Sequence, residues 1–179
     1  MQVTIRPAEA RDLSALVRIY NHYIESSPAT FDLAPHTIDE RRDWFGAYSD
    51  RGRHRMLVAE TAPDSDAGGA PRVVGYAGSG QFRKKAAYDP SVEASIYLDP
   101  DATGHGVGAV LYEELLGLMR GEPGVHRVYA GITLPNDASV ALHERFGFER
   151  VGTFREVGLK FDRYWDVAWY ELDVEGGTA

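Results

Sequence analysis

The chain has 179 residues, the length of one ordinary domain, and its 44% hydrophobic and 26% charged residues indicate a packed core and exclude a disordered protein. Nineteen basic against twenty-seven acidic residues give a net charge of −8, which argues against general binding to nucleic acid. Cysteine is absent, so disulfide scaffolds, thiolate zinc sites and cysteine nucleophiles are excluded. No apolar run reaches the roughly 20 residues that a membrane span needs, so we expect a cytoplasmic protein. From the length, we expect a single domain over residues 1–179.

The first part of the chain predicts a short strand and two helices. Residues 3–5 alternate as a strand does. A helix is expected over 13–25, because apolar residues recur there at helical spacing. A second helix is expected over 37–48, where Thr37 and Glu40 form a capping-box pattern.

The remainder alternates between strand and helix patterns. Residues 61–71 are rich in Ala, Asp, Gly and Pro and predict a hairpin loop. The order βααβββαβαββ indicates an α/β fold around one mixed sheet. The predicted segments are strands over 56–59, 73–77, 92–98 and 127–134, helices over 107–118 and 136–147, and a hairpin of two long strands over 151–174.

A glycine-rich turn follows the strand that ends at Leu98 and precedes a helix. Glycines let backbone N–H groups gather at one point, and the helix N-terminus adds partial positive charge, so such a turn binds phosphate groups. The Lys-Ser/Thr pair of a Walker A loop is missing. Gly104-x-Gly106-x-x-Ala109 fits the loose dinucleotide fingerprint, although several strands and two helices precede it. A plain strand-to-helix turn is the third interpretation.

Two motifs resemble those of the GNAT acyltransferase superfamily. Its pyrophosphate loop, Arg/Gln-x-x-Gly-x-Gly/Ala, matches Thr103-x-x-Gly106-x-Gly108, with Thr in place of Arg or Gln. Its later block, Asn-x-x-Ala/Ser-x-x-Leu-Tyr-x-x-x-Gly-Phe, matches residues 136–148, with His143 in place of Tyr. With a histidine at this position, the block resembles that of the phosphinothricin and methionine sulfone/sulfoximine acetyltransferase branch of the superfamily. The resemblance covers nearly the whole chain and implies a GNAT fold, with a mixed central sheet splayed around acetyl-CoA and flanking helices.

The same resemblance implies the residues that bind acetyl-CoA. The glycine turn would hold the pyrophosphate, the preceding strand would pair with the pantetheine arm, and the Asn136 side chain would reach the cofactor. The implied cofactor-binding residues are Ile96, Tyr97, Leu98, Thr103, Gly104, His105, Gly106, Val107, Gly108, Ala109 and Asn136.

Glu93 and His143 are the candidate catalytic residues. An amine must lose a proton before it attacks a thioester, which requires a base. Glu93 interrupts an apolar strand and shares a face with Ser95 and Tyr97, where apolar surroundings would raise the pKa of its carboxyl. His143 could protonate the leaving thiolate or act as base with Glu93. The competing interpretations are a solvent-facing Glu93 and a His143 packed between Ser139 and Phe146.

The amine site is expected at a basic segment. Arg83 and Lys85 point the same way in extended backbone, and the resemblance implies that they bind the substrate carboxylate, with Tyr88 in support and Phe31 as a pocket wall. The branch further implies a homodimer. A zincin motif would need a second histidine after His143, so we expect no metal site.

These patterns predict an acetyl-CoA-dependent N-acetyltransferase that modifies the α-amino group of a small amino-acid-like substrate by direct transfer. Phosphinothricin, methionine sulfoximine and methionine sulfone are the implied substrate types. We expect neither nucleic acid nor a membrane as partner. The alternatives are an N-acetyltransferase of protein N-termini or of another small amine, and a non-catalytic acyl-CoA-binding module.

Overall fold

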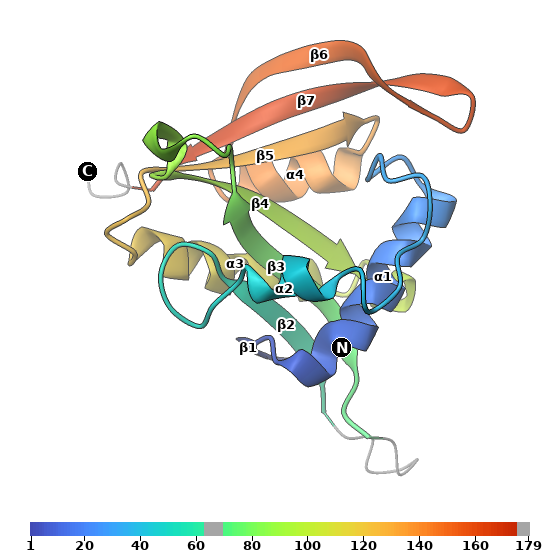
Figure 1. Ribbon diagram of the computed structural model, residues 1–179, viewed down its shortest axis with the longest axis vertical. Coiled ribbons are helices and arrows are strands. Elements are labelled where there is room, and N and C mark those ends of the chain that lie inside the picture. Colours follow the sequence, from blue (N-terminus) through green and yellow to red (C-terminus); the bar gives the residue numbers. More distant parts are fainter. Residues whose placement is uncertain (63–69, 175–179) are drawn as a thin grey trace.

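The computed structural model describes residues 1–62 and 70–174, which build one seven-stranded sheet (Figure 1). All neighbouring strands are antiparallel except the central pair, β4 and β5. The strands lie in the order β1 (Val3–Pro7), β2 (Met56–Thr61), β3 (Val73–Gln81), β4 (Ser91–Leu98), β5 (Arg127–Leu134), β7 (Arg163–Asp173) and β6 (Glu149–Lys160).

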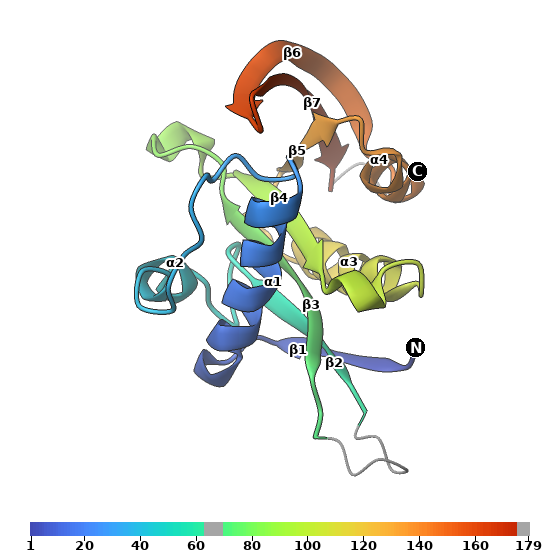
Figure 2. The ribbon, with the colours of Figure 1, turned by 90° about the vertical axis from the view of Figure 1, so that its right-hand side faces the viewer.

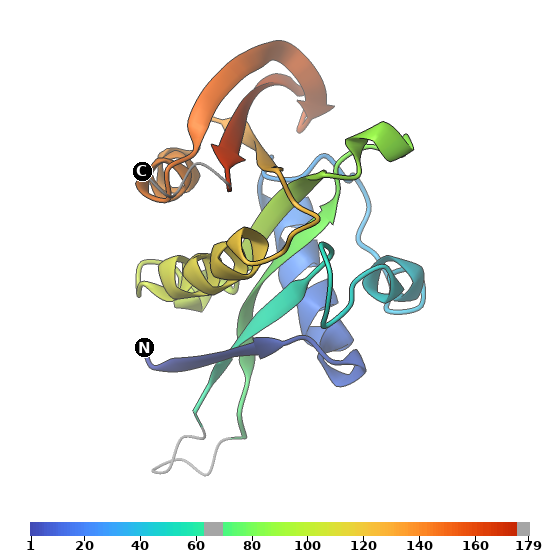
Figure 3. The ribbon, with the colours of Figure 1, turned by 90° about the vertical axis from the view of Figure 1, so that its left-hand side faces the viewer.

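Helices cover both faces of this sheet (Figures 2 and 3). The helices α1 (Leu13–Ser26) and α2 (Arg42–Gly46) lie on one face, and α3 (Val107–Arg120) and α4 (Asp137–Arg145) lie on the other. Three short 3₁₀ turns complete the elements: η1 (Ala10–Asp12), η2 (Ala86–Tyr88) and η3 (Pro100–Ala102).

The alternation of side chains along each strand produces two hydrophobic cores. On one face, Leu16 and Ile19 of α1 pack with Met56, Val58 and Tyr76. On the other face, the buried residues of α3 pack against those buried residues of β2 and β3 whose side chains point to that side. Both sides of β2 and β3 are therefore closed to water, which explains the continuous apolar runs in these two strands.

The predicted order of strands and helices is confirmed, and so is the mixed α/β sheet. The second helix is shorter than the predicted 37–48, because α2 has only five residues. The capping box does form, since the Glu40 carboxylate accepts the Thr37 N–H at 2.7 Å. The next hydrogen bonds, however, run from i+3 to i, as from Arg41 to Ile38, and keep this segment in tight turns.

The predicted hairpin loop lies only partly within the described residues. Thr61 N–H donates to the carbonyl of Arg72 at 2.9 Å, which closes the base of the hairpin between β2 and β3. Residues 63–69 lie outside the described part of the chain. Among the helices of the described residues, none is long and apolar enough to cross a membrane.

The central strands part from each other after a short paired stretch. The parallel register between β4 and β5 covers only Ser91–Glu93 against Arg127–Tyr129. Beyond it, β4 continues to Leu98 along β3, while β5 continues to Leu134 along β7. Figure 1 shows the two strands diverging, so the sheet opens into a V whose apex lies at Glu93.

Candidate active site

Glu93 lies at the apex of the V and faces a cavity of about 440 Å³. Trp44 and Tyr48 cover this cavity from the α2 side, and Gly80 and Ser95 form its floor on β3 and β4. The lining also includes Ala47, His54 and Gln81. The prediction that Glu93 and Ser95 share a face is confirmed.

The electrostatics of Glu93 reflect a balance between burial and one cation. Burial raises the pKa of the Glu93 carboxyl, and the Arg83 guanidinium opposes that rise. The Nη1 atom of Arg83 lies 3.8 Å from Oε2 of Glu93, and both side chains are about half exposed. Glu93 thus faces a cavity while its carboxyl has a pKa above the usual range, which suits a group that accepts a proton.

Aromatic rings hold Arg83 in this place. Its guanidinium lies 4.1 Å from the ring centre of Phe82 and 5.4 Å from that of Trp169. Phe82 stacks on Tyr129, which is the register partner of Glu93 on β5, at 4.5 Å between ring centres. The cation therefore belongs to a wall built from β3, β5 and β7, next to the base.

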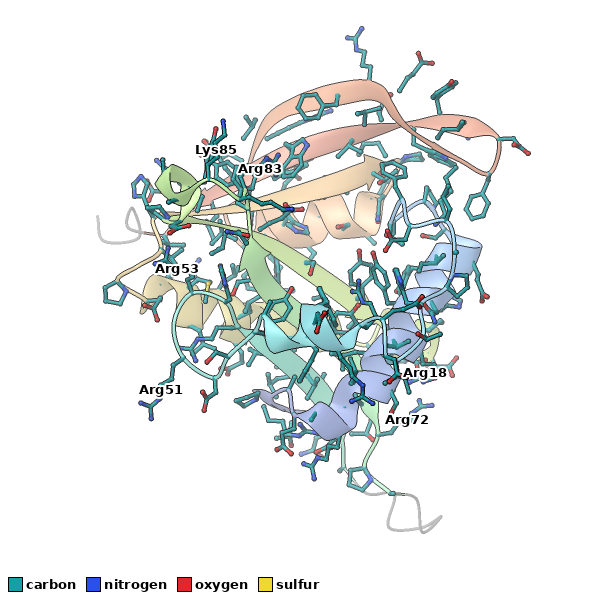
Figure 4. The ribbon with its side chains drawn as sticks, in the orientation of Figure 1. Arg18, Arg51, Arg53, Arg72, Arg83 and Lys85 are labelled. Atoms are coloured by element: carbon teal, nitrogen blue, oxygen red, sulfur yellow. The ribbon has the colours of Figure 1, made fainter. Side chains whose placement is uncertain are left out.

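The other predicted substrate residues are placed differently. Tyr88 contacts Phe82 edge to face at 6.0 Å and so joins the Arg83 wall. Lys85 is exposed at the start of η2, and Figure 4 shows it near Arg83 on the segment that follows β3. Phe31 lies in the turn after α1, where the outer atoms of its ring occupy the space beside Gly158 of β6.

His143 is buried, with 3% of its surface exposed, and does not line the Glu93 cavity. Its Nδ1 lies 2.7 Å from the Ser139 carbonyl, so Nδ1 carries the proton and Nε2 accepts the Tyr112 hydroxyl at 2.9 Å. Burial lowers the pKa of the imidazole, while the Ser139 carbonyl opposes that change. The imidazole is therefore neutral and both nitrogens are occupied. Its role in the chemistry stays a prediction.

The glycine turn has the backbone that an anion site requires. Gly104 and Gly106 adopt φ values of 77° and 79°, and the space where their Cβ atoms would stand is open. Gly106 is the N-cap of the 14-residue helix α3, whose first N–H groups and dipole face the turn. Gly108 packs under Leu98, which fixes the helix start against the end of β4.

Three of the residues predicted to contact the cofactor make hydrogen bonds within the protein. The Thr103 hydroxyl donates to the Pro100 carbonyl at 2.8 Å, and the Leu98 carbonyl accepts the Tyr23 hydroxyl at 2.8 Å. The Asn136 oxygen caps α4 by accepting the Ser139 N–H at 3.1 Å. The backbone of Ile96 and Tyr97 pairs with β3 on one side and diverges from β5 on the other.

The remaining loop residues, His105, Val107 and Ala109, complete the turn. His105 is exposed, Val107 is buried in the core, and the Ala109 N–H donates to the Gly106 carbonyl at 3.1 Å. The V and the turn thus present backbone groups of β4, backbone groups of β5 and the N-terminus of α3 to one extended ligand, as acetyl-CoA is. Among the described residues, no group of three or more His, Cys, Asp or Glu could hold a metal ion.

Sequence reasoning missed several residues around the site. Trp44, Tyr48, His54, Tyr129 and Trp169 belong to no motif that the sequence analysis identified. The signal that could have located Trp169 is its partner on β5: Gly131 lies opposite it and leaves room for the indole.

Comparisons with known proteins point to one family. Residues 16–148 match the family model of the acetyltransferase (GNAT) family. The chain is 47% identical over 170 residues to a phosphinothricin N-acetyltransferase of Streptomyces coelicolor, covering 95% of each chain. It is 35% identical over 175 residues to an L-methionine sulfoximine/L-methionine sulfone acetyltransferase of Pseudomonas paraeruginosa, covering 98% of this chain and 96% of that one.

A solved structure shows the same fold. The crystal structure of a GNAT superfamily phosphinothricin acetyltransferase from Sinorhizobium meliloti, in complex with acetyl-CoA, has a TM-score of 0.87 and 34% identity. The match covers 99% of this chain and 91% of that chain. The fold predicted from the two sequence motifs is thereby confirmed.

Proposed function

The chain belongs to the GNAT family of acetyltransferases, and we propose that it transfers the acetyl group of acetyl-CoA to the α-amino group of a small amino acid. The substrate types are phosphinothricin, methionine sulfoximine and methionine sulfone, which the names of the relatives support. The observation that carries the proposal is the pair of Glu93 and Arg83 beside the cavity. A base for the ammonium group and a cation for the carboxylate lie 3.8 Å apart, as an α-amino acid requires.

Acetyl-CoA, when bound, supplies an acetyl thioester that an amine can attack. The glycine turn and the N-terminus of α3 would hold its pyrophosphate, and the free edge of β4 its pantetheine arm. Glu93 accepts a proton from the substrate ammonium, directly or through water, because its raised pKa brings its basicity closer to that of an amine. The chain has no cysteine, which favours direct transfer within a ternary complex.

The proposal assigns different proton roles to Glu93 and His143. Glu93 faces the cavity and takes the proton of the amine. His143 remains the candidate acid for the departing thiolate. The proton that it would give is the one on Nδ1, which first has to leave its hydrogen bond with the Ser139 carbonyl. Arg83, with Lys85 and Tyr88 nearby, binds the carboxylate of the amino acid, and Phe31 forms part of the opposite wall.

The first experiment measures CoA release with the three substrate types beside free methionine, the amide derivatives and short N-terminal peptides. We expect turnover with the free amino acids and poor turnover with their amides, which lack the carboxylate for Arg83. Glu93→Gln is expected to lower kcat by roughly 10²–10⁴-fold. Glu114→Gln, on the exposed face of α3, is the matched control. Equal rates for peptides and amino acids would instead support an N-terminal acetyltransferase.

The proposal includes a homodimer formed by the hairpin of β6 and β7. Six large apolar side chains on this hairpin are more than half exposed, a patch typical of an interaction site: Val151, Phe154, Val157, Leu159, Phe161 and Tyr164. Sedimentation of Phe154→Asp is expected to show a monomer where the parent chain is a dimer. Leu33→Asp, at an exposed leucine outside the hairpin, is the control. The enzyme would work in the cytoplasm, where acetyl-CoA is used.

A further inference from the structure

Lys160 is a buried charged residue to which the reaction gives no role. It ends β6, and only 4% of its surface is exposed. Its Nζ donates to the carbonyls of Ser27 and Thr30 at 2.8 Å each, and to that of Tyr23 at 3.4 Å. These three acceptors belong to the end of α1 and the turn after it. One ammonium thus joins the tip of the β6–β7 hairpin to a segment 130 residues away in the sequence.

The chemistry of this contact keeps the lysine charged. Burial lowers the pKa of the Lys160 ammonium, and the carboxylate of Asp32 opposes that change. Each partner of Nζ is an acceptor, so only the protonated amine, with three donors, can satisfy all of them. A cation near the last carbonyls of α1 is also favoured by the helix dipole.

The hairpin tip reinforces the contact from its own side. Phe161 and Asp162 form the two-residue turn with φ values of 53° and 54°, a conformation that side chains rarely adopt. The Trp165 indole N–H donates to the Lys160 carbonyl at 2.9 Å. Two residues before Lys160 on β6, Gly158 has no side chain, and the ring of Phe31 occupies the space where a Cβ atom would stand. Lys160 and Gly158 together hold the segment from Ser27 to Phe31 against β6.

That segment lies on the same side of the sheet as the base, and side-chain contacts connect it to β4. The Thr30 hydroxyl lies 2.6 Å from the Tyr20 hydroxyl, which also donates to Asp32 at 2.8 Å. The Tyr20 ring packs edge to face against Tyr97 at 5.1 Å. Tyr97 points to the same face of β4 as Glu93. A continuous set of contacts therefore runs from Lys160 through Thr30 and Tyr20 to the strand that carries the base.

We propose that Lys160 is a positioning residue that fixes the Ser27–Asp32 segment as the acceptor-side wall of the site. The proposal rests on the proposed function, because the acceptor is the amine substrate. Without the ammonium, three backbone carbonyls lose their donor and the segment can move away from β6, and Phe31 with it. Binding of the amine then weakens, whereas acetyl-CoA, which binds along β4 and the glycine turn, is unaffected.

The test compares Lys160→Met with Arg163→Met, which removes a positive charge from an exposed residue of the same tip. Lys160→Met is expected to raise the KM for the amine roughly 10- to 100-fold, because small misplacements of positioning groups carry penalties of that size. Its kcat and its KM for acetyl-CoA are expected to change less than about threefold. Arg163→Met is expected to match the parent chain in all three constants.

A chemical rescue separates the ammonium from general packing. The chain has no cysteine, so Lys160→Cys followed by 2-bromoethylamine places an aminoethyl thioether, close in shape and charge to lysine, at one site. Intact mass verifies the modification. We expect the modified protein to recover the parent KM for the amine, and the iodoacetamide-treated protein to keep the high one.

Amide hydrogen exchange of residues 27–32 tests the same claim without any acceptor. Exchange there is expected to rise in Lys160→Met and to stay unchanged in Arg163→Met. Unchanged exchange, an unchanged amine KM, or a raised KM that the aminoethyl group does not restore would each overturn the proposal. Failure of the parent chain to acetylate any amino acid would overturn the proposed substrate class instead, and the exchange result would still decide the role of Lys160. Should Lys160→Met fail to fold, Lys160→Gln takes its place.

Discussion

The buried hydrogen bond between Tyr112 and His143 allows structural and catalytic roles to be measured separately. The Tyr112→Phe substitution leaves Nε2 of a buried histidine without a donor, and His143→Phe leaves a fully buried tyrosine hydroxyl without an acceptor. Each orphaned polar group costs about 1–3 kcal/mol. In the double variant neither group remains, and rings pack against rings as before. We therefore expect it to be less destabilised than the sum of the single variants, by about 0.5–3 kcal/mol.

Urea unfolding of the four proteins gives this coupling energy directly. The pH dependence supplies a second readout. Because burial lowers the pKa of His143, the unfolded chain binds a proton at pH values where the folded chain does not. His143 therefore makes the free energy of unfolding depend on pH. Its contribution is fully present above about pH 6.5, the pKa of an unfolded histidine, and is lost as the pH falls toward the lower pKa of the folded chain. The His143→Phe variant is expected to lose this part of the dependence.

Activity of the double variant then tests the proposed proton donor. If His143 protonates the thiolate, a double variant that has regained its stability should still turn over roughly 10²–10⁴-fold more slowly than the parent chain. Strict additivity of the two single-variant costs would refute the structural reasoning, since it would mean that the two groups do not depend on each other. Near-parent turnover in the stable double variant would remove His143 from the chemistry.

Three further predictions concern the two arms of the site. Arg83→Met is expected to move the acid limb of the kcat/KM profile to higher pH by less than about one unit, because Arg83 opposes the raised pKa of the base through a half-exposed contact; a shift to lower pH would contradict this. Gly158→Ala is expected to displace Phe31, lower stability by about 1–3 kcal/mol in urea unfolding, and raise the KM for the amine. Gly106→Val, at a φ of 79°, is expected to abolish the rise in Tm that acetyl-CoA gives the parent chain, whereas Val110→Ala on the exposed side of α3 should keep it.

Local patterns in the sequence were sufficient for most of the elements and for the glycine turn between β4 and α3. Helical spacing located α1 and α3, because a one-sided helix must repeat its apolar residues every three or four positions. Strand alternation placed Glu93 and Ser95 on one face, and the cavity confirms this. The short α2 could not be foreseen, since a capping box marks where a helix can begin and not whether the turns after it continue.

The contacts that complete the site depend on registers that no local pattern specifies. Arg83 meets Glu93 because β3 and β4 pair antiparallel with Gly80 opposite Glu93. His143 contacts Tyr112 because α3 and α4, which β5 separates in the sequence, lie on one face of the sheet. Lys160 lies within the predicted hairpin of 151–174 and ends β6, where a lysine is normally solvated. Its carbonyl partners come from the first helix and the turn after it. Such residues are recognised only when the strands and helices have been placed.

Lys160, His143 and Glu93 differ in what surrounds their titratable groups, and this difference supports the proposal that Glu93 takes the substrate proton. Lys160 is enclosed by carbonyl acceptors and stays a cation. His143 has one acceptor and one donor at its two nitrogens and stays neutral. A proton transfer by either group would first break a buried hydrogen bond. Glu93 faces a cavity, its carboxyl has a raised pKa, and its nearest cation is a half-exposed Arg83 that a substrate carboxylate can draw away. Binding of an amino acid would then raise the pKa of Glu93 further as the substrate ammonium group arrives. In the proposed reaction, recognition of the substrate carboxylate and proton transfer from its amine are therefore coupled in one site.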